Sequence, residues 1–356
     1  MENPHPKPST LPFSVDFVRT VAILMVIFVH ASSFPYSIPG EITPLVMVNW
    51  FTSDIYGATG YLGVPIFVML SGALLLNPQK ADEPLRAFYK KRFNRIGLPL
   101  IFWTIIFFAW NYFVHNQPLT LFNIQQGLLT GSYPIMWFLY MLAGLYLATP
   151  FLRVLTKHID RKKFTILITL WFIGAVIAPL IHTFTLFDYN PVMFVFSDWA
   201  GYFLLGAFLI QSKIRRTVVY PVLIFGFLVA VIGAWVVTLT VGETATGFFH
   251  GYLSFNMILA SAALFLILVN IPRERIENGN GTINRLIHWI GQNTLPFYLL
   301  HIIVLETIQI GLLGWRYPYT GIVLVDAMGL FLMAFAFSAT IIYLLKKIPY
   351  VCKLIG

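Results

Sequence analysis

The chain has 356 residues, of which 58% are hydrophobic and only 10% are charged, and its mean hydropathy is +0.79. Soluble domains carry about 25% charged residues, so this composition excludes a water-soluble protein and predicts an integral membrane protein. The formal net charge of +9 does not indicate a nucleic-acid partner, because the cations form short clusters between apolar segments. The single cysteine, Cys352, excludes an intramolecular disulfide and a cysteine-based metal site, and we expect no metal.

Ten apolar segments are long enough to span a bilayer, which requires roughly 20 mainly apolar residues per helix. The sequence therefore predicts an all-α, polytopic integral membrane protein with about ten transmembrane helices. No periodic repeat and no long polar linker interrupts them, so residues 1–356 are expected to form a single membrane domain. The predicted spans are 14–33, 59–77, 96–115, 135–155, 164–183, 192–211, 218–239, 249–271, 287–310 and 320–345.

The distribution of Lys and Arg between the loops predicts how these helices are oriented. Alternate loops between the predicted spans are rich in Lys and Arg. The other loops contain Arg316 as their only Lys or Arg, and they contain acidic residues such as Glu41, Asp188 and Asp198. Because cytoplasmic loops carry an excess of Lys and Arg, both termini are predicted to be cytoplasmic. The basic clusters that define the cytoplasmic side lie within 80–95, 153–163, 213–216, 273–285 and 346–353.

The first span holds three ionisable residues, Asp16, Arg19 and His30, in the run SVDFVRTVAILMVIFVH. Charged residues inside a span cost about 2.5–3.5 kcal/mol each on insertion scales, which makes them functional candidates. At 100° per residue the three share one helix face, and His30 lies about 16 Å further from the cytoplasm than Arg19. The alternative is structural: an Asp16–Arg19 ion pair at the helix start, and a hydrogen-bonded packing role for His30.

The second span and the loop after it hold a serine and a basic cluster. Ser71, in YLGVPIFVMLSGALLL, would be a nucleophile only with a base beside it, and close helix packing is the alternative. The loop contains YKKRFNRIGLP, where Arg92 and Arg95 are three residues apart and share a helix face. Paired guanidinium groups suit phosphate oxygens, so Arg92, Arg95 and Lys90 are candidates for a phosphate site. The alternative is charge that serves only topology.

Two later spans hold aromatic residues and a second intramembrane histidine. Trp137, in WFLYMLAGLYLATP, indicates either the wall of a substrate groove or an interfacial aromatic belt. His301, in NTLPFYLLHIIVLE, is predicted at a depth similar to that of His30, with Tyr298 one turn earlier on the same face. His301 either orients a substrate or packs in the core, bonded to a neighbouring helix. Glu306, further out, is predicted to be a surface or mouth residue.

Taken together and in chain order, these residues resemble the integral membrane acyltransferase-3 family. The likeness is to its single-domain O-acetyltransferases of the enterobacterial common antigen type. The chain departs from the family pattern at Thr20, where Gly is usual, and at Thr294, where Ser is common. The motifs that carry the resemblance are Asp16 with Arg19-x10-His30, Gly63 to Leu76, Arg92 to Pro99, Trp137 to Pro150, and Gly291 to His301.

The resemblance implies transfer of an acyl group, usually acetyl, from coenzyme A to a carbohydrate hydroxyl. It implies acetyl-CoA as the donor, a carbohydrate or glycolipid acceptor, and a multi-pass location in the bilayer of a bacterial cytoplasmic (inner) membrane. An imidazole with a pKa near neutrality suits removal of a proton from a sugar hydroxyl. The expected catalytic residues are His30, Arg19 and Asp16; the donor-binding residues are Arg92, Arg95 and Lys90; and the acceptor-binding residues are His301, Tyr298, Trp137 and Ser71.

Two other functions fit the same polar residues. A transporter or flippase for a polyprenyl-linked glycan or another amphiphile would also place Asp, Arg and His inside the membrane. The sequence shows no inverted repeat, which disfavours this reading. A sensor or binding module that uses the fold without chemistry is the remaining alternative.

Overall fold

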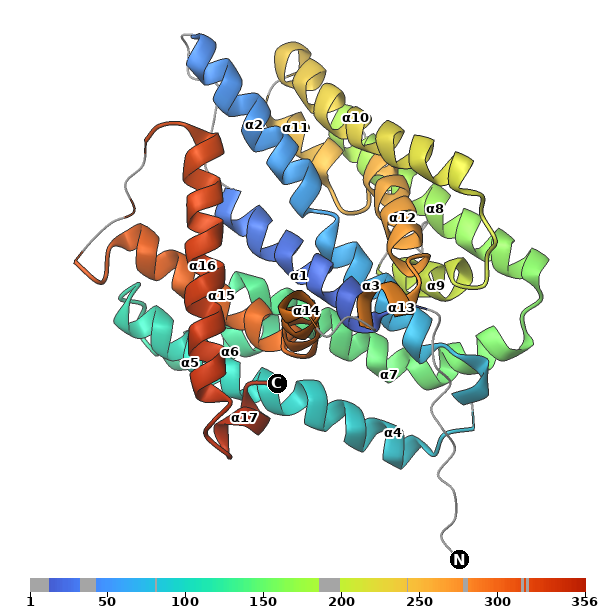
Figure 1. The fold of residues 1–356 in the computed structure, drawn as a ribbon, viewed down its shortest axis with the longest axis horizontal. Coiled ribbons are helices and arrows are strands. Elements are labelled where there is room, and N and C mark those ends of the chain that lie inside the picture. The colour runs from blue at the N-terminus through green and yellow to red at the C-terminus, as the bar shows by residue number, and fades with distance from the viewer. Residues whose placement is uncertain are drawn as a thin grey trace, which may run out of the picture.

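The computed structural model describes residues 13–32, 43–80, 82–185, 199–241, 243–277, 281–314, 317 and 320–356. This described part of the chain is helical and contains no strand (Figure 1). The loop residues Glu41, Asp188, Asp198 and Arg316 lie outside it, as do residues 192–198 of one predicted span.

Eight helical segments within the described residues have the length and hydropathy to cross a membrane. The chain is thus an all-helical, multi-pass membrane protein, as the sequence predicts. The eight segments contain α1 (Val15–Ser32), α2 with α3 (Pro44–Gly60, Gly63–Leu75), α4 with α5 (Leu85–Arg92, Leu98–Phe113), α6 with α7 (Leu121–Thr130, Trp137–His158), α8 (Arg161–Phe184), α10 (Arg216–Thr240), α11 with α12 (Glu243–His250, Phe255–Val269) and α16 (Val323–Leu345). The short elements are η1 (Pro78–Lys80), the π-helical η2 (Phe93–Gly97), η3 (Pro134–Met136), α13 (Arg273–Glu277) and α17 (Val351–Leu354).

Two of the ten predicted spans are not among these eight segments. The segment 287–310 is a pair, α14 (Thr282–Gln292) and α15 (Thr294–Ile310), bent by 83°. The bend precedes Pro296, which lacks the backbone N–H needed to continue a helix from Gln292. In the described part of 192–211 the helix is α9 (Ala200–Leu209), whose length of about 15 Å is half of the roughly 30 Å hydrocarbon core.

Helix α2 is a structural element that the predicted spans miss. Its N-terminus is capped by Thr43, whose side-chain oxygen accepts a hydrogen bond from the Val46 N–H, and Pro44 occupies the first turn. Thr-Pro is a recognised start signal for a helix, because Pro has the helical φ and needs no donor there. The helix carries polar residues, among them Asn49 and Asp54, which lower its hydropathy and conceal it from an apolar-window search.

Helix α1 lies inside the bundle and contacts α2, α3, α12, α14, α15 and α16 (Figure 1). Its buried apolar residues include Val18, Ile23 and Ile27, all with no exposed surface. The polar face predicted for this helix is therefore directed into protein rather than lipid.

Helices α3 and α9 approach each other so closely that only glycine fits at two positions. A Cβ on Gly72 would lie 1.7 Å from the Phe203 carbonyl oxygen, and one on Gly206 would lie 1.9 Å from that of Met69. Both obstacles are backbone atoms, so no side-chain rotation relieves the overlap. This reciprocal contact explains the small residues of the second span as packing residues.

We expect Gly72→Ala to separate α3 from α9 and to lower stability by about 1–3 kcal/mol, as overpacking does. The measurement is the thermal unfolding midpoint of the purified protein. Gly144→Ala is the matched control, because nothing lies within 4 Å of a Cβ built there. Equal midpoints for the two variants would contradict the close contact.

Glu306, which the sequence predicts to be a surface or mouth residue, is half-buried and makes specific hydrogen bonds. Its carboxylate accepts hydrogen bonds from Trp110 Nε1 at 2.6 Å and from the Tyr133 hydroxyl, and lies 3.2 Å from His115 Nε2. Its side chain is only 18% exposed. Glu306 therefore ties α15 to α5 and to the segment that leads into α7.

The orientation of the helices remains a prediction from the loop charges. Reporter fusions after residues of about 85 and 160 are expected to report the cytoplasm, and fusions after about 45 and 120 the outside. Inversion of two of these four would overturn the predicted topology.

Candidate active site

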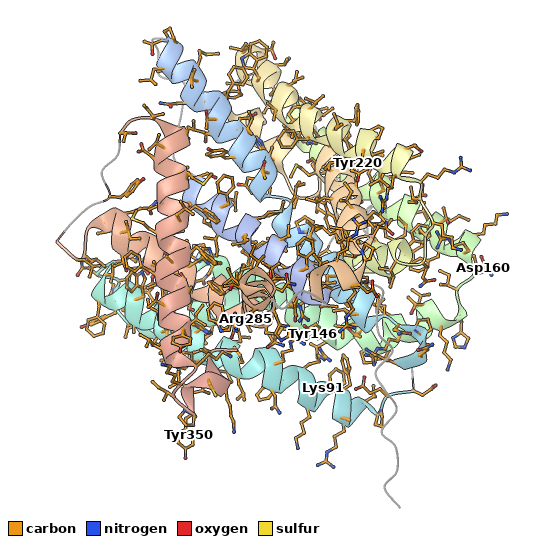
Figure 2. The ribbon with its side chains drawn as sticks, viewed as in Figure 1. Lys91, Tyr146, Asp160, Tyr220, Arg285 and Tyr350 are labelled. Atoms are coloured by element: carbon orange, nitrogen blue, oxygen red, sulfur yellow. The ribbon has the colours of Figure 1, made fainter. Side chains whose placement is uncertain are left out.

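A cavity of about 330 Å³ lies where α1 begins and α3 ends. Basic side chains from α1, η1, α4 and η2 line it together with apolar and aromatic ones, and its described lining includes no Asp or Glu. Figure 2 labels Lys91 on α4 and Tyr146 on α7, two of the residues that line this cavity. An anion is the ligand that such a lining favours. The basic lining residues are Arg19, Lys80, Lys91, Arg92 and Arg95.

Helix α4 ends at Arg92 and passes into the π-helical turn η2, which carries Arg95. Single π turns inside helices are frequent at functional sites. The Arg92 guanidinium lies 5.4 Å from the Phe88 ring and 5.5 Å from the Tyr146 ring. Its Nε is buried and has no hydrogen-bond partner among the described residues, so it retains a donor for a ligand.

The predicted basic trio is only partly brought together. Arg92 and Arg95 line the cavity, whereas Lys90 is exposed and its place is taken by Lys91. Lys80 also lines the cavity, and its pKa is lowered first by burial and then by repulsion from Arg153. A bound anion would relieve this repulsion.

Arg153, which the sequence groups with loop charges, is 2% exposed. Its Nε donates to the Leu75 carbonyl at 2.6 Å, and its Nη1 donates to the Lys80 carbonyl at 3.1 Å and to Glu83 at 2.8 Å. Because Leu75 and Lys80 line the cavity, Arg153 holds part of its wall. Its hydrogen-bond partners Leu75, Lys80 and Glu83 lie far from Arg153 in the sequence. The composition of the segment around Arg153 therefore does not predict this role.

Asp16 and Arg19 form the ion pair that the sequence allows, with 3.6 Å between Oδ1 and Nη1. A partner that sequence reasoning missed is His288 of α14, whose Nδ1 lies 2.7 Å from Asp16 Oδ2. Thr20, one of the departures from the family pattern, donates its hydroxyl proton to the Ile287 carbonyl at 2.8 Å. Asp16 thus positions Arg19 at the cavity and joins α1 to α14.

The two intramembrane histidines lie beside each other, with His30 and His301 ring centroids 5.2 Å apart. His301 is completely buried, and its Nδ1 lies 2.9 Å from the Phe297 carbonyl oxygen. A carbonyl oxygen only accepts, so this bond places the proton of neutral His301 on Nδ1 and a lone pair on Nε2. That Nε2 is buried without a partner among the described residues.

Tyr298 connects the cavity to the histidine pair. It lines the cavity, its ring centroid lies 6.2 Å from that of His301, and its hydroxyl donates to the Ile135 carbonyl at 2.8 Å. Ser71 also lines the cavity, and the described lining includes no histidine or carboxylate. Trp137 is not part of this lining and instead contacts Trp199.

We expect His301→Gln to lower turnover about tenfold, less than the 10²–10⁴-fold typical of losing a direct proton-transfer group. The reason is that His301 is fully buried and its ring lies beside that of His30, so we expect it to orient His30 rather than to transfer the proton itself. The measurement is kcat at saturating donor and acceptor, with the thermal midpoint as the folding control. Wild-type turnover would assign His301 to packing alone.

A family model described as an acyltransferase domain, that of the acyltransferase-3 family (Acyl_transf_3), matches residues 13–347 of the chain. That range contains the cavity, the Asp16–Arg19 pair and both histidines. No curated protein and no solved structure matches the chain.

Proposed function

The chain belongs to the acyltransferase-3 family, and from that premise we propose that it moves an acetyl group from cytoplasmic acetyl-CoA to a carbohydrate hydroxyl. The acceptor is a cell-surface carbohydrate or its lipid-linked precursor, of the kind that enterobacterial common antigen represents. The protein acts as one membrane domain in a bacterial cytoplasmic membrane, with the donor on the inner side and the acceptor on the outer side.

The observation that carries the donor assignment is the cationic cavity. Coenzyme A bears a diphosphate and a further phosphate, which suit five basic residues and the unused Arg92 donor. Arg19 lies at the level of this cavity, about 16 Å along α1 from His30. We therefore assign Arg19 to the donor and not to the oxyanion of the reacting carbonyl. This separation is of the order of an extended pantetheine arm, which would pass Tyr298 to reach His30.

At the histidine pair the transfer requires one base. The acceptor hydroxyl oxygen attacks the thioester carbonyl carbon while its proton moves to a ring nitrogen of His30. The carbon–sulfur bond then breaks, coenzyme A leaves as the thiolate, and the imidazolium returns the proton to the sulfur. His301, with its Nδ1 proton bonded to the Phe297 carbonyl, supports the neighbouring ring as a neutral group.

The test is thiol release from acetyl-CoA by the purified protein, measured with and without a glycan acceptor. Acceptor-dependent release, together with acetate recovered on the glycan, is the expected result. Failure of acetyl-CoA to bind or to react with any of a panel of surface glycans would contradict the proposed donor and reaction.

A further inference from the structure

A buried pair of a carboxylate and an imidazole lies away from the cationic cavity. Asp54 of α2 and His250 at the end of α11 are 3.1 Å apart between Oδ1 and Nε2, with side chains 3% and 14% exposed. Beyond this contact, neither Asp54 oxygen has a hydrogen-bond partner among the described residues. His250 is thus the more exposed member of the pair, and the Asp54 carboxylate can accept further hydrogen bonds.

A chain of four aromatic rings, in contact with one another, begins at His250. Tyr61 stacks on the imidazole with ring centroids 6.0 Å apart, and its other contact is the Tyr252 ring at 5.3 Å. Tyr252 in turn lies 5.9 Å from Trp137 and 5.2 Å from Trp199. Each of these four rings is only partly buried, although they contact one another inside the bundle.

This group lies beyond the histidine pair on the side opposite the donor cavity. Gly60 packs on Val29, since a Cβ there would lie 2.5 Å from Val29 Cβ, so Tyr61 stands at about the level of His30. Asp54 precedes Gly60 by six residues, which places it about 9 Å further along α2, away from the cavity that α3 reaches. That distance is of the order of one to two sugar rings.

We propose that His250, backed by Asp54, and the rings of Tyr61, Tyr252 and Trp137 bind the sugar ring of a neutral acceptor. The inference rests on the proposed function and locates the acceptor within it. Aromatic faces stack on the apolar C–H faces of a pyranose. An imidazole positioned by a carboxylate can form hydrogen bonds with the hydroxyl groups of the same sugar. The carboxylate also disfavours anionic sugars, so donor and acceptor are sorted by charge to opposite sides of His30.

The test uses the purified His30→Gln protein, so that no turnover occurs, and follows tryptophan fluorescence during titration with neutral glycosides. The probes are the methyl glycosides of glucose, galactose and N-acetylglucosamine, with methyl glucuronide as the anionic comparison. A saturable response to at least one neutral probe is expected, and about tenfold or more weaker binding after His250→Gln or Asp54→Asn, as for loss of a charged hydrogen bond.

Asp326→Asn is the matched control, because this equally buried carboxylate already accepts three hydrogen bonds from Thr320 and Gly321. It should lower the thermal midpoint and leave glycoside affinity unchanged. In the otherwise wild-type enzyme, Asp54→Asn should raise the KM for a glycoside that serves as acceptor and not the KM for acetyl-CoA.

Two outcomes overturn the acceptor site. One is the absence of a saturable response to every neutral glycoside. The other is an Asp54→Asn protein with a lowered midpoint and unchanged glycoside affinity, which would make the pair a structural tie between α2 and α11. Glycoside binding without any acetyl transfer would instead contradict the proposed reaction and leave this site in place.

Discussion

Changing both Arg92 and Arg95 to Ala is expected to raise the apparent KM for acetyl-CoA about a hundredfold. Both side chains line the cationic cavity, and Arg92 retains a buried Nε without a partner among the described residues. A hydrogen bond to a charged group contributes about 1.5–3 kcal/mol, so two lost contacts to phosphate account for such a factor. Turnover at saturating donor should change little, because His30, where we propose that the thioester reacts, lies about 16 Å along α1 from Arg19 and the cavity.

The measurement is the initial rate of thiol release as a function of acetyl-CoA concentration, at fixed acceptor. Lys90→Ala is the matched control: Lys90 belongs to the same basic cluster but is exposed and outside the cavity lining. Its KM should equal that of the wild type. If the double variant also keeps the wild-type KM, Arg92 and Arg95 serve only topology.

The hydrophobic pattern predicted the multi-pass architecture because bilayer length is a strong constraint that most of the apolar segments meet on their own. Helical periodicity likewise placed Asp16, Arg19 and His30 on one face, and similar depth in two outward-running spans anticipated the contact of His30 with His301. These predictions need only distances along a single helix.

The rest depended on tertiary contacts or on irregular backbone. The π-helical turn η2 changes the helical phase, and Lys91 rather than Lys90 lines the cavity. The roles of His288 and Arg153 arise from partners far along the chain, Asp16 and Leu75, for which local sequence gives no signal. Asp54 lies in α2, a helix that the hydropathy pattern did not predict because its polar residues lower its mean hydropathy.

Substitution of His30 by Gln is expected to have the largest effect on turnover in this protein. His30 lies on the inward face of α1, with its ring centroid 5.2 Å from that of His301 and with Arg19 at the donor cavity on the same helix. Whether the hydroxyl attacks the thioester directly or the imidazole first takes the acetyl group, the reaction requires a ring nitrogen with a free lone pair. Gln preserves size and polarity but supplies no such base.

We therefore expect His30→Gln to lower kcat about 10²–10⁴-fold, with the KM for acetyl-CoA and the thermal midpoint close to wild type. The KM is preserved because the basic residues that we propose hold the donor phosphates line the cavity at the level of Arg19, and His30 is not among the residues that line it. His158→Gln is the matched control, since His158 is exposed at the end of α7 and bonds only to the Val154 carbonyl of its own helix among the described contacts. The measurement is turnover of both purified variants at saturating acetyl-CoA and acceptor. A His30→Gln rate within a factor of about three of wild type would make His30 structural and the proposed mechanism wrong.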